Sequence, residues 1–157
     1  MPDNRTIATI GELKTLKGQA LGNGAWLQIT QERVNAFAEV TGDHQWIHID
    51  AERAAASPFG GTIAHGYLTL SIQSLLNRDW EGARIDLGQK MTINYGLNRV
   101  RFITPVRVGK RIRMHNKLVE VQDVSPGVYH ILVEHTIEIE DEPRPAMVAE
   151  SIRRVLL

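Results

Sequence analysis

Hydrophobic and polar residues alternate along the second half of the chain in a way that is typical of β-strands. Over 128–140 the odd-numbered positions make one mostly apolar face and the even-numbered positions a more polar one. This period of two predicts a strand with one face buried. The segment 111–124 is a second extended candidate, and Ser125-Pro126-Gly127 supplies a turn between the two, which predicts an antiparallel hairpin. Further strand candidates are 91–95 and 100–102, which Gly96 separates, and 146–157, which follows a turn at 141–145.

Helical spacing dominates the first half. Apolar residues recur over 31–41 at intervals of three and four, Thr30 is suited to cap the start, and Glu32 in the first turn suits the helix dipole. Gly42 is a natural stop, so we predict a helix over 31–41 with Asp43 just past its end. The segment 10–16 predicts a shorter amphipathic piece.

The segment from Ile63 to Trp80 follows a loop at 57–61, and Thr62 is placed to cap it. It is apolar on nearly all sides, which predicts a buried helix. Helices first and antiparallel strands afterwards indicate the α+β class. The simplest arrangement is a curved antiparallel sheet wrapped around one long buried helix.

Composition narrows the class of protein. The length of 157 residues fits a single domain over 1–157. Lys plus Arg equals Asp plus Glu at 18 each, which argues against binding to nucleic acid or to an anionic membrane surface. The absence of cysteine excludes disulfides and thiolate catalysis. No leader-like or membrane-spanning apolar run is visible, so we expect a cytoplasmic protein.

The stretch FAEVTGDHQWIHID carries the clearest candidate chemistry. Asp43 and His48 could hold and activate one water, since an imidazole titrates near neutrality and can act as a base. The alternative is that Asp43 accepts backbone hydrogen bonds in a loop and His48 is a satisfied strand histidine. Four apolar neighbours could form a dry wall around the pair: Val40, Trp46, Ile47 and Ile49.

A metal site is a further alternative. Asp43, His44, His48 and His65 carry suitable ligand atoms. His44 and His48 would share a face only on a continuous helix, and Gly42 together with the β-prone 46–47 pair argues against one. We therefore expect no metal.

Gly66 is the candidate oxyanion donor. It would lie in the first turn of the central helix, where backbone N–H groups lack intrahelical partners. Without a side chain, Gly66 would let a ligand oxygen approach its N–H closely. The alternative is that Gly66 only permits tight packing. His65, just before it, could orient a ligand or cap the helix, and capping is the simpler interpretation.

A basic tract extends over 94–113. Arg99, Arg101 and Lys110 could contact the phosphates of a nucleotide-bearing substrate. The alternative, that these cations belong to the solvated face of strands, is the simpler one.

Three segments together resemble the MaoC-like dehydratase family: TGDHQWIHID, AHGYLTLSIQSLL and INYGLNRVRFITPVRVGKRIR. The resemblance covers nearly the whole chain, from Leu13 to Val155. It is strongest to the branch related to nodulation protein N and to small bacterial R-specific enoyl-CoA hydratases. The family's usual core has Asn-Pro where this chain has Gln45-Trp46, a departure that leaves Asp43 and His48 in place.

The resemblance implies a hot-dog fold and a homodimer whose two sheets join edge to edge. It implies reversible hydration of a trans-2-enoyl-CoA to an (R)-3-hydroxyacyl-CoA without a cofactor. Asp43 and His48 match the water-activating pair, Gly66 the oxyanion donor, and Ser74 a serine that supports the aspartate. The rivals are a hot-dog thioesterase and a non-catalytic acyl-binding subunit. Acyl chain length, the choice between coenzyme A and a carrier protein, and the pathway stay open.

Overall fold

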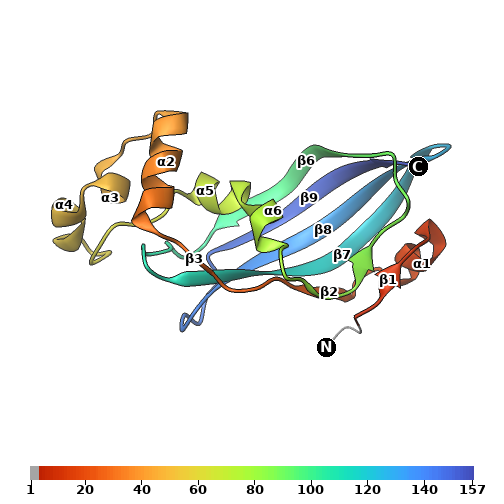
Figure 1. The fold of residues 1–157 in the computed structure, drawn as a ribbon, viewed down its shortest axis with the longest axis horizontal. Coiled ribbons are helices and arrows are strands. Elements are labelled where there is room, and N and C mark those ends of the chain that lie inside the picture. Colours follow the sequence, from red (N-terminus) through yellow and green to blue (C-terminus); the bar gives the residue numbers. More distant parts are fainter. Residues whose placement is uncertain (1–3) are drawn as a thin grey trace.

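A curved antiparallel sheet from the second half of the chain frames the structure, a computed structural model that describes residues 4–157 (Figure 1). Its long strands are β6 (Met91–Phe102), β7 (Arg111–Ser125), β8 (Val128–Ile139) and β9 (Met147–Leu156). Three short strands join them: β2 (Ala20–Asn23), β3 (Leu27–Gln28) and β4 (Glu81–Gly82). The strand order is β4-β2-β7-β8-β9-β6, and β3 pairs with β7 off this path. Residues 1–3, where the segment examined for a leader begins, lie outside the described residues.

The predicted hairpin is confirmed. Strands β7 and β8 are antiparallel neighbours, and the chain reverses between Ser125 and Val128. On β8 the odd-numbered residues from Ile131 to Ile139 are buried. Strand β9 then pairs with β8 along its whole length without a register shift.

The predicted helix over 31–41 is confirmed as α2 (Gln31–Thr41). The Thr30 hydroxyl accepts from the Arg33 backbone N–H, and Gly42 ends the helix in the left-handed conformation. The short amphipathic piece is α1 (Ile10–Thr15). Two further short helices, α3 (Trp46–Ile49) and α4 (Ala51–Ala55), follow α2. None of the helices within residues 4–157 has the length and apolar character that crossing a membrane requires.

The prediction of one long, wholly buried helix over 63–80 is wrong in two respects. The segment forms two short helices, α5 (Gly66–Ser71) and α6 (Gln73–Leu76), with the break at Ile72. The chain starts the first helix late because Ile63 is engaged in an antiparallel bridge to Arg107. One side of the pair is open to solvent: Tyr67 is 68% exposed. Apolar residues on all sides of a helix predict that the helix is covered. They do not tell whether its own chain or another chain covers it.

Further short strands complete the architecture: β1 (Thr6–Ile7) and β5 (Arg84–Ile85). β1 and β5 form a separate two-stranded parallel sheet. The core consists of two apolar clusters on the same side of the large sheet. One packs α2, α5 and α6 against the sheet, and the other packs α1 and the 80–87 segment against it.

Strand β6 is the free edge of the large sheet, since among the strands of residues 4–157 it pairs only with β9. Five of its apolar side chains are exposed: Met91, Ile93, Tyr95, Leu97 and Phe102. Its register shifts between Asn94 and Gly96, the point at which the sequence predicts an interruption. The two predicted strands are therefore one bulged strand with unpaired backbone groups along its outer side.

Candidate active site

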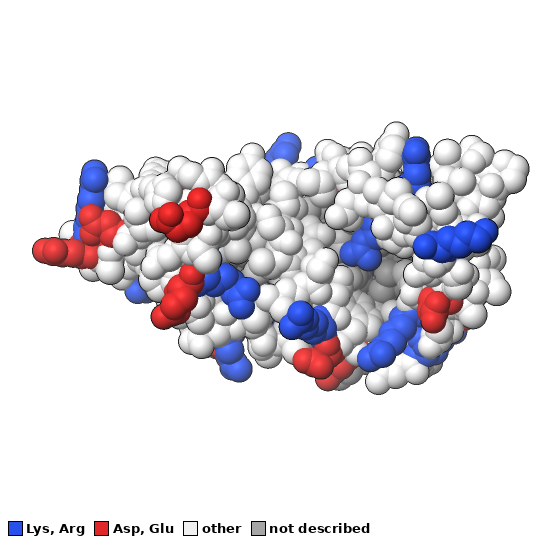
Figure 2. Space-filling view, turned by 45° about the horizontal axis from the view of Figure 1, so that its top comes forward, with Lys and Arg blue, Asp and Glu red and all other residues white. Residues whose placement is uncertain are grey.

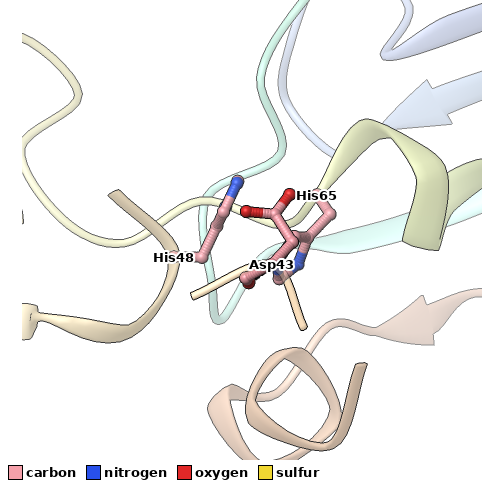
Figure 3. A group of neighbouring side chains, drawn as sticks. All are labelled: Asp43, His48 and His65. Carbon is pink, nitrogen blue, oxygen red and sulfur yellow. The ribbon is translucent and has the colours of Figure 1, made fainter. Parts of the chain in front are cut away.

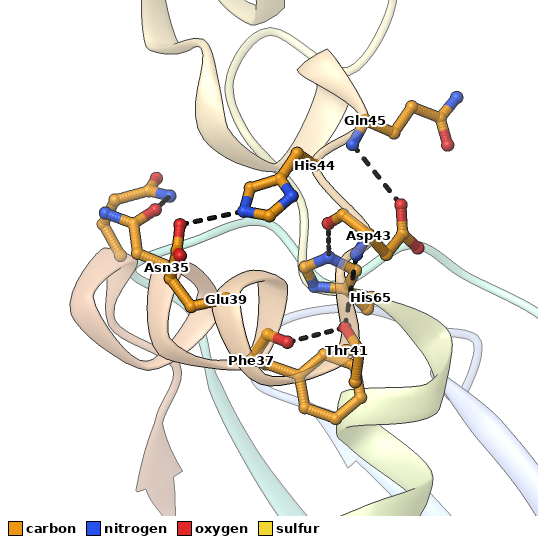
Figure 4. A network of polar contacts seen from close by, with 9 residues as sticks. Asn35, Phe37, Glu39, Thr41, Asp43, His44, Gln45 and His65 are labelled. Carbon is orange, nitrogen blue, oxygen red and sulfur yellow. Dashed lines mark hydrogen bonds and ion pairs between the residues drawn. The ribbon is translucent and has the colours of Figure 1, made fainter.

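Asp43 lies in the turn that follows α2. The left-handed backbone of Gly42, at φ 74°, takes the chain out of the helix, and Asp43 is the next residue. Asp43 Oδ1 accepts a hydrogen bond from the Gln45 backbone N–H at 3.3 Å (Figure 4). The side chain is exposed in a single chain, so the carboxylate is free to meet a ligand or a second protein surface.

Asp43, His48 and His65 converge on one place from three different segments (Figure 3). One ligand atom from each of these side chains lies within 4.8 Å of the others. This distance is short enough for a single water or ion to contact all three groups. The sequence separations, five residues and then seventeen, do not by themselves require this meeting.

His48 is held in a defined orientation and tautomer. Its Nδ1 lies 2.7 Å from the Ile63 carbonyl oxygen, which can only accept, so Nδ1 carries the proton and Nε2 the free lone pair. The ring is 6% exposed. Burial lowers the pKa of His48; the hydrogen bond to Ile63 opposes this, His65 lowers the pKa further, and Asp43 has a smaller opposing effect. At neutral pH the imidazole is therefore a neutral base.

His65 completes the cluster. Its Nε2 lies 3.0 Å from the Asp43 backbone oxygen, which can only accept, so Nε2 donates to it and Nδ1 is left for another partner (Figure 4). That Nδ1 is buried and has no hydrogen-bond partner within residues 4–157. The rings of His48 and His65 stack with centroids 3.7 Å apart. The prediction that His65 caps the helix is wrong: it occupies the N-cap position, but its side chain makes no capping bond.

The segment 46–49, expected to be extended, forms the one-turn helix α3, and His48 belongs to it rather than to a strand. His44 turns away from the cluster and its Nε2 lies 2.8 Å from Glu39 Oε1, a contact that raises its pKa (Figure 4). Of the four residues weighed as metal ligands, three therefore come together and His44 does not.

The predicted dry wall is only partly present. Val40 is 80% exposed and Ile49 is 39% exposed, so neither is enclosed in an apolar wall. Ile47 does line a pocket of about 340 Å³ together with His48, Ile63 and other mostly apolar residues. The pocket, rather than the residues nearest in sequence, supplies the dry surroundings.

Gly66 lines the same pocket as His48. As the first residue of α5 it has no intrahelical acceptor for its N–H, and no backbone acceptor elsewhere within 4–157 receives it. A Cβ atom at this position would lie 2.9 Å from Phe102 Cγ. Gly66 is therefore needed for packing against Phe102, and its role as an oxyanion donor stays a prediction.

The remaining predicted residues lie apart from this cluster. Ser74 is on α6 and lines a different pocket, and it forms no hydrogen bond with Asp43 within the described chain. Arg99 and Arg101 are exposed on β6. The Lys110 ammonium donates to the Glu140 carbonyl oxygen at 3.3 Å. Their supporting and phosphate-binding roles stay predictions.

Gln31 is a positioning residue that the sequence did not reveal. Its Nε2 donates to the His48 carbonyl oxygen at 2.8 Å, and its Oε1 accepts from the Thr62 hydroxyl at 2.6 Å. Gln31 thereby joins the start of α2 to the segments that carry His48 and Ile63. A glutamine at the first position of a helix carries no sequence signal for this role.

Comparison with known proteins places the chain in a family. Residues 12–139 match the MaoC like domain family. The chain is 49% identical to 3-hydroxyacyl-thioester dehydratase Z of Mycobacterium tuberculosis, over 96% of this chain and 97% of that protein. It is 44% identical to nodulation protein N of Rhizobium leguminosarum bv. viciae, over 92% of this chain and 89% of that one.

Among solved structures, the R-hydratase PhaJ1 of Pseudomonas aeruginosa superposes with a TM-score of 0.68 at 20% identity, over 89% of this chain and 81% of that one. This likeness concerns the fold, which is the hot-dog fold of such proteins. With the family match over most of its length and two relatives above 40% identity, the chain belongs to the MaoC-like dehydratase family.

Proposed function

We propose that this protein is an R-specific enoyl-CoA hydratase, which adds water reversibly to a trans-2-enoyl-CoA and gives an (R)-3-hydroxyacyl-CoA. The observation that carries the proposal is the meeting of Asp43, His48 and His65 within 4.8 Å beside a mostly apolar pocket. The dehydratase and hydratase names of its relatives agree with chemistry on a 3-hydroxyacyl or enoyl thioester.

In the hydration direction, His48 Nε2 removes a proton from a water that the Asp43 carboxylate orients. The hydroxide equivalent bonds to the β-carbon as the π bond of the C–C double bond breaks, and a proton that balances the one taken by His48 reaches the α-carbon on the same face. His48 suits the role of base because its Nδ1–H is fixed on the Ile63 carbonyl and its lowered pKa keeps Nε2 free. His65 stacks on that ring and disfavours its protonation.

Negative charge develops on the thioester oxygen while the new C–O bond forms. In this proposal the Gly66 N–H donates to that oxygen. A preorganised donor of this kind contributes about 2.7–4 kcal/mol to transition-state stabilisation where it has been measured. Support comes from the shared pocket of Gly66 and His48 and from the absence of a backbone acceptor for this amide within 4–157.

A thioesterase is the competing enzyme. Hot-dog thioesterases rely on a carboxylate from the central helix, and α5 and α6 contain neither Asp nor Glu. A hydratase removes the absorbance of the conjugated enoyl thioester without releasing thiol, whereas a thioesterase releases thiol. The deciding experiment follows both signals with crotonyl-CoA and purified protein, before and after dialysis against a chelator.

Loss of absorbance without thiol release, unchanged by the chelator, is the expected result. Thiol release at the same rate would assign a thioesterase, and neither signal would leave an acyl-binding subunit. Loss of hydration on chelation would instead make the Asp43, His48 and His65 cluster a metal site.

We further propose that the working form is a homodimer in which β6 pairs with β6 of a second copy. The unpaired outer edge of β6 and the exposed side chains of Tyr95 and Leu97 support this arrangement. A second copy would also cover the open side of α5, where Tyr67 is exposed.

Replacing Leu97 by lysine is expected to weaken the dimer by at least about tenfold, because a charge would be buried in the new interface. Sedimentation velocity over a concentration series measures the change. Val124→Lys is the matched control, since Val124 at the hairpin tip is 45% exposed against 47% for Leu97. Equal sedimentation of the two variants as dimers would place the interface elsewhere.

A further inference from the structure

A cleft of about 470 Å³ lies on the same side of the sheet as the core, beyond the end of α6. One wall is the 77–85 segment, and the other is made by residues of β2, β7, β8 and β9. Figure 2 shows a hollow on this side of the molecule with several basic side chains at its rim. The lining shares no residue with the pocket that contains His48. Nothing proposed above uses this cleft.

A polar band crosses the sheet beside the cleft, between the two apolar core clusters. His135, 0% exposed, connects Asn116 at 2.6 Å with the Ser151 hydroxyl at 2.7 Å. Asn116 Nδ2 in turn donates to Asn77 Oδ1 at 3.2 Å. These side chains satisfy one another, so the band needs no ligand of its own.

Arg153 differs from the rest of the band. It lies two residues after Ser151 on β9, hence on the same face of the strand, and it lines the cleft. Its guanidinium has five N–H donors, but it makes no side-chain hydrogen bond and no ion pair within residues 4–157. Asp79 also lines the cleft but is exposed and forms no ion pair with it.

Burial lowers the pKa of Arg153, because a charged guanidinium is less stable when it is partly removed from water. Holding a cation partly out of water without a counter-ion costs free energy, and a bound anion would offset that cost. The neighbouring His135 cannot be that anion. A second pocket, of about 310 Å³, lies along β9 and β6 and is also lined by Arg153, so the guanidinium stands where two cavities approach each other.

We propose that Arg153 binds the carboxylate of a carboxylate-ended aliphatic chain, with the chain lying along the apolar part of the cleft. A guanidinium pairs with a carboxylate through two parallel hydrogen bonds. The rest of the lining suits a hydrocarbon chain, because it includes Leu21, Trp80, Ile85 and Val133. A phosphate is less well matched, since Arg84 is the only other cation that lines this cleft.

Two sources could supply such a carboxylate: a free fatty acid, or the far end of an acyl thioester whose chain carries a terminal carboxyl group. In both cases the group that contacts Arg153 is a carboxylate at the end of an aliphatic chain. The proposal does not rest on the hydratase reaction, because binding of a free carboxylic acid can be measured without turnover.

The test is calorimetric titration of the full-length protein with octanoate and, separately, with 1-octanol, which has the same chain without the charge. Octanoate is expected to bind at least about tenfold more tightly than 1-octanol. Arg153→Met should remove this preference and leave 1-octanol binding unchanged. Arg154→Met is the matched control, since Arg154 lies on the opposite face of the same strand, where it contacts His130 and Tyr95.

Equal affinity for octanoate and 1-octanol in the unmodified protein would overturn the proposal, whether or not the variants fold. So would a folded Arg153→Met protein that keeps the preference. A second experiment distinguishes a free fatty acid from an acyl terminus. It compares the kinetics of two enoyl-CoAs of equal length, one with and one without a terminal carboxylate. If the carboxylate is the acyl terminus, Arg153→Met raises KM for the first substrate alone and leaves kcat unchanged. If both substrates respond alike while octanoate binding is lost, the site serves a free acid.

Discussion

Asp43→Asn and His48→Gln are each expected to lower kcat for hydration of crotonyl-CoA by about 10²–10⁴, the usual loss when a general acid or base is removed. In the proposed mechanism, the first change removes the negative charge that orients water, and the second removes the lone pair that takes its proton. His48→Gln keeps an amide that can still donate to the Ile63 carbonyl, so α3 should remain in place. The decrease of enoyl-thioester absorbance measures the rate, and circular dichroism checks the fold.

His44→Gln is the control for this pair of variants. His44 is the neighbour of Asp43, but it is exposed and bound to Glu39, outside the cluster. Its replacement should leave kcat within about threefold of the unmodified protein, which is a change of less than 1 kcal/mol in the barrier. If Asp43→Asn or His48→Gln retained activity as this control does, the assignment of the active site would be refuted.

Acid is expected to destabilise this protein through His135. Burial, together with the charge of Arg153, lowers the pKa of His135 from 6.5 to about 4. Between these values the unfolded chain binds a proton that the folded chain does not, so stability falls as pH falls. At 1.36 kcal/mol per pH unit, the contribution present above pH 6.5 and lost below pH 4 is about 3 kcal/mol.

Urea unfolding at a series of pH values from 7.5 to 4 measures this loss. In His135→Asn the fall in unfolding free energy between pH 6.5 and 5 should be smaller by about 2 kcal/mol, although the variant starts from a lower stability because the band loses a partner. His44→Gln should not flatten the curve, because the bond to Glu39 raises the pKa of His44 instead. Parallel curves for the unmodified protein and His135→Asn would show that His135 does not govern the acid response.

The parts of the fold that could be predicted are those with local causes. The bounds of α2 follow from Thr30 and Gly42, which act within a turn of the helix ends. The β7–β8 hairpin follows from alternation and from one turn. In contrast, the preference of the 46–47 pair for extended structure gave way to helix α3, because the Ile63 carbonyl and Gln31 hold this segment from outside it.

The residues of the candidate site also fall into two groups, those that a local motif predicts and those that depend on distant contacts. Asp43 and His48 stand in one motif and were named from it. His65 was a candidate metal ligand and helix-start residue, but its contact with the Asp43 backbone could not be predicted, because it spans 22 residues of sequence. Alternation also could not tell that β6 ends the sheet, since a strand has the same pattern at an edge as in the middle. The late start of α5 likewise depends on the bridge between Ile63 and Arg107.

The free edge of β6 has a further consequence for the newly made chain. Its 12 residues offer a ready template for strand addition, and their exposed apolar side chains make that addition favourable with the wrong partners as well as the right one. Chains in which this edge stays unpaired are therefore at risk of aggregation, and the risk rises with their concentration. Overproduction conditions that favour rapid pairing should give a better yield of native protein than those that merely slow synthesis.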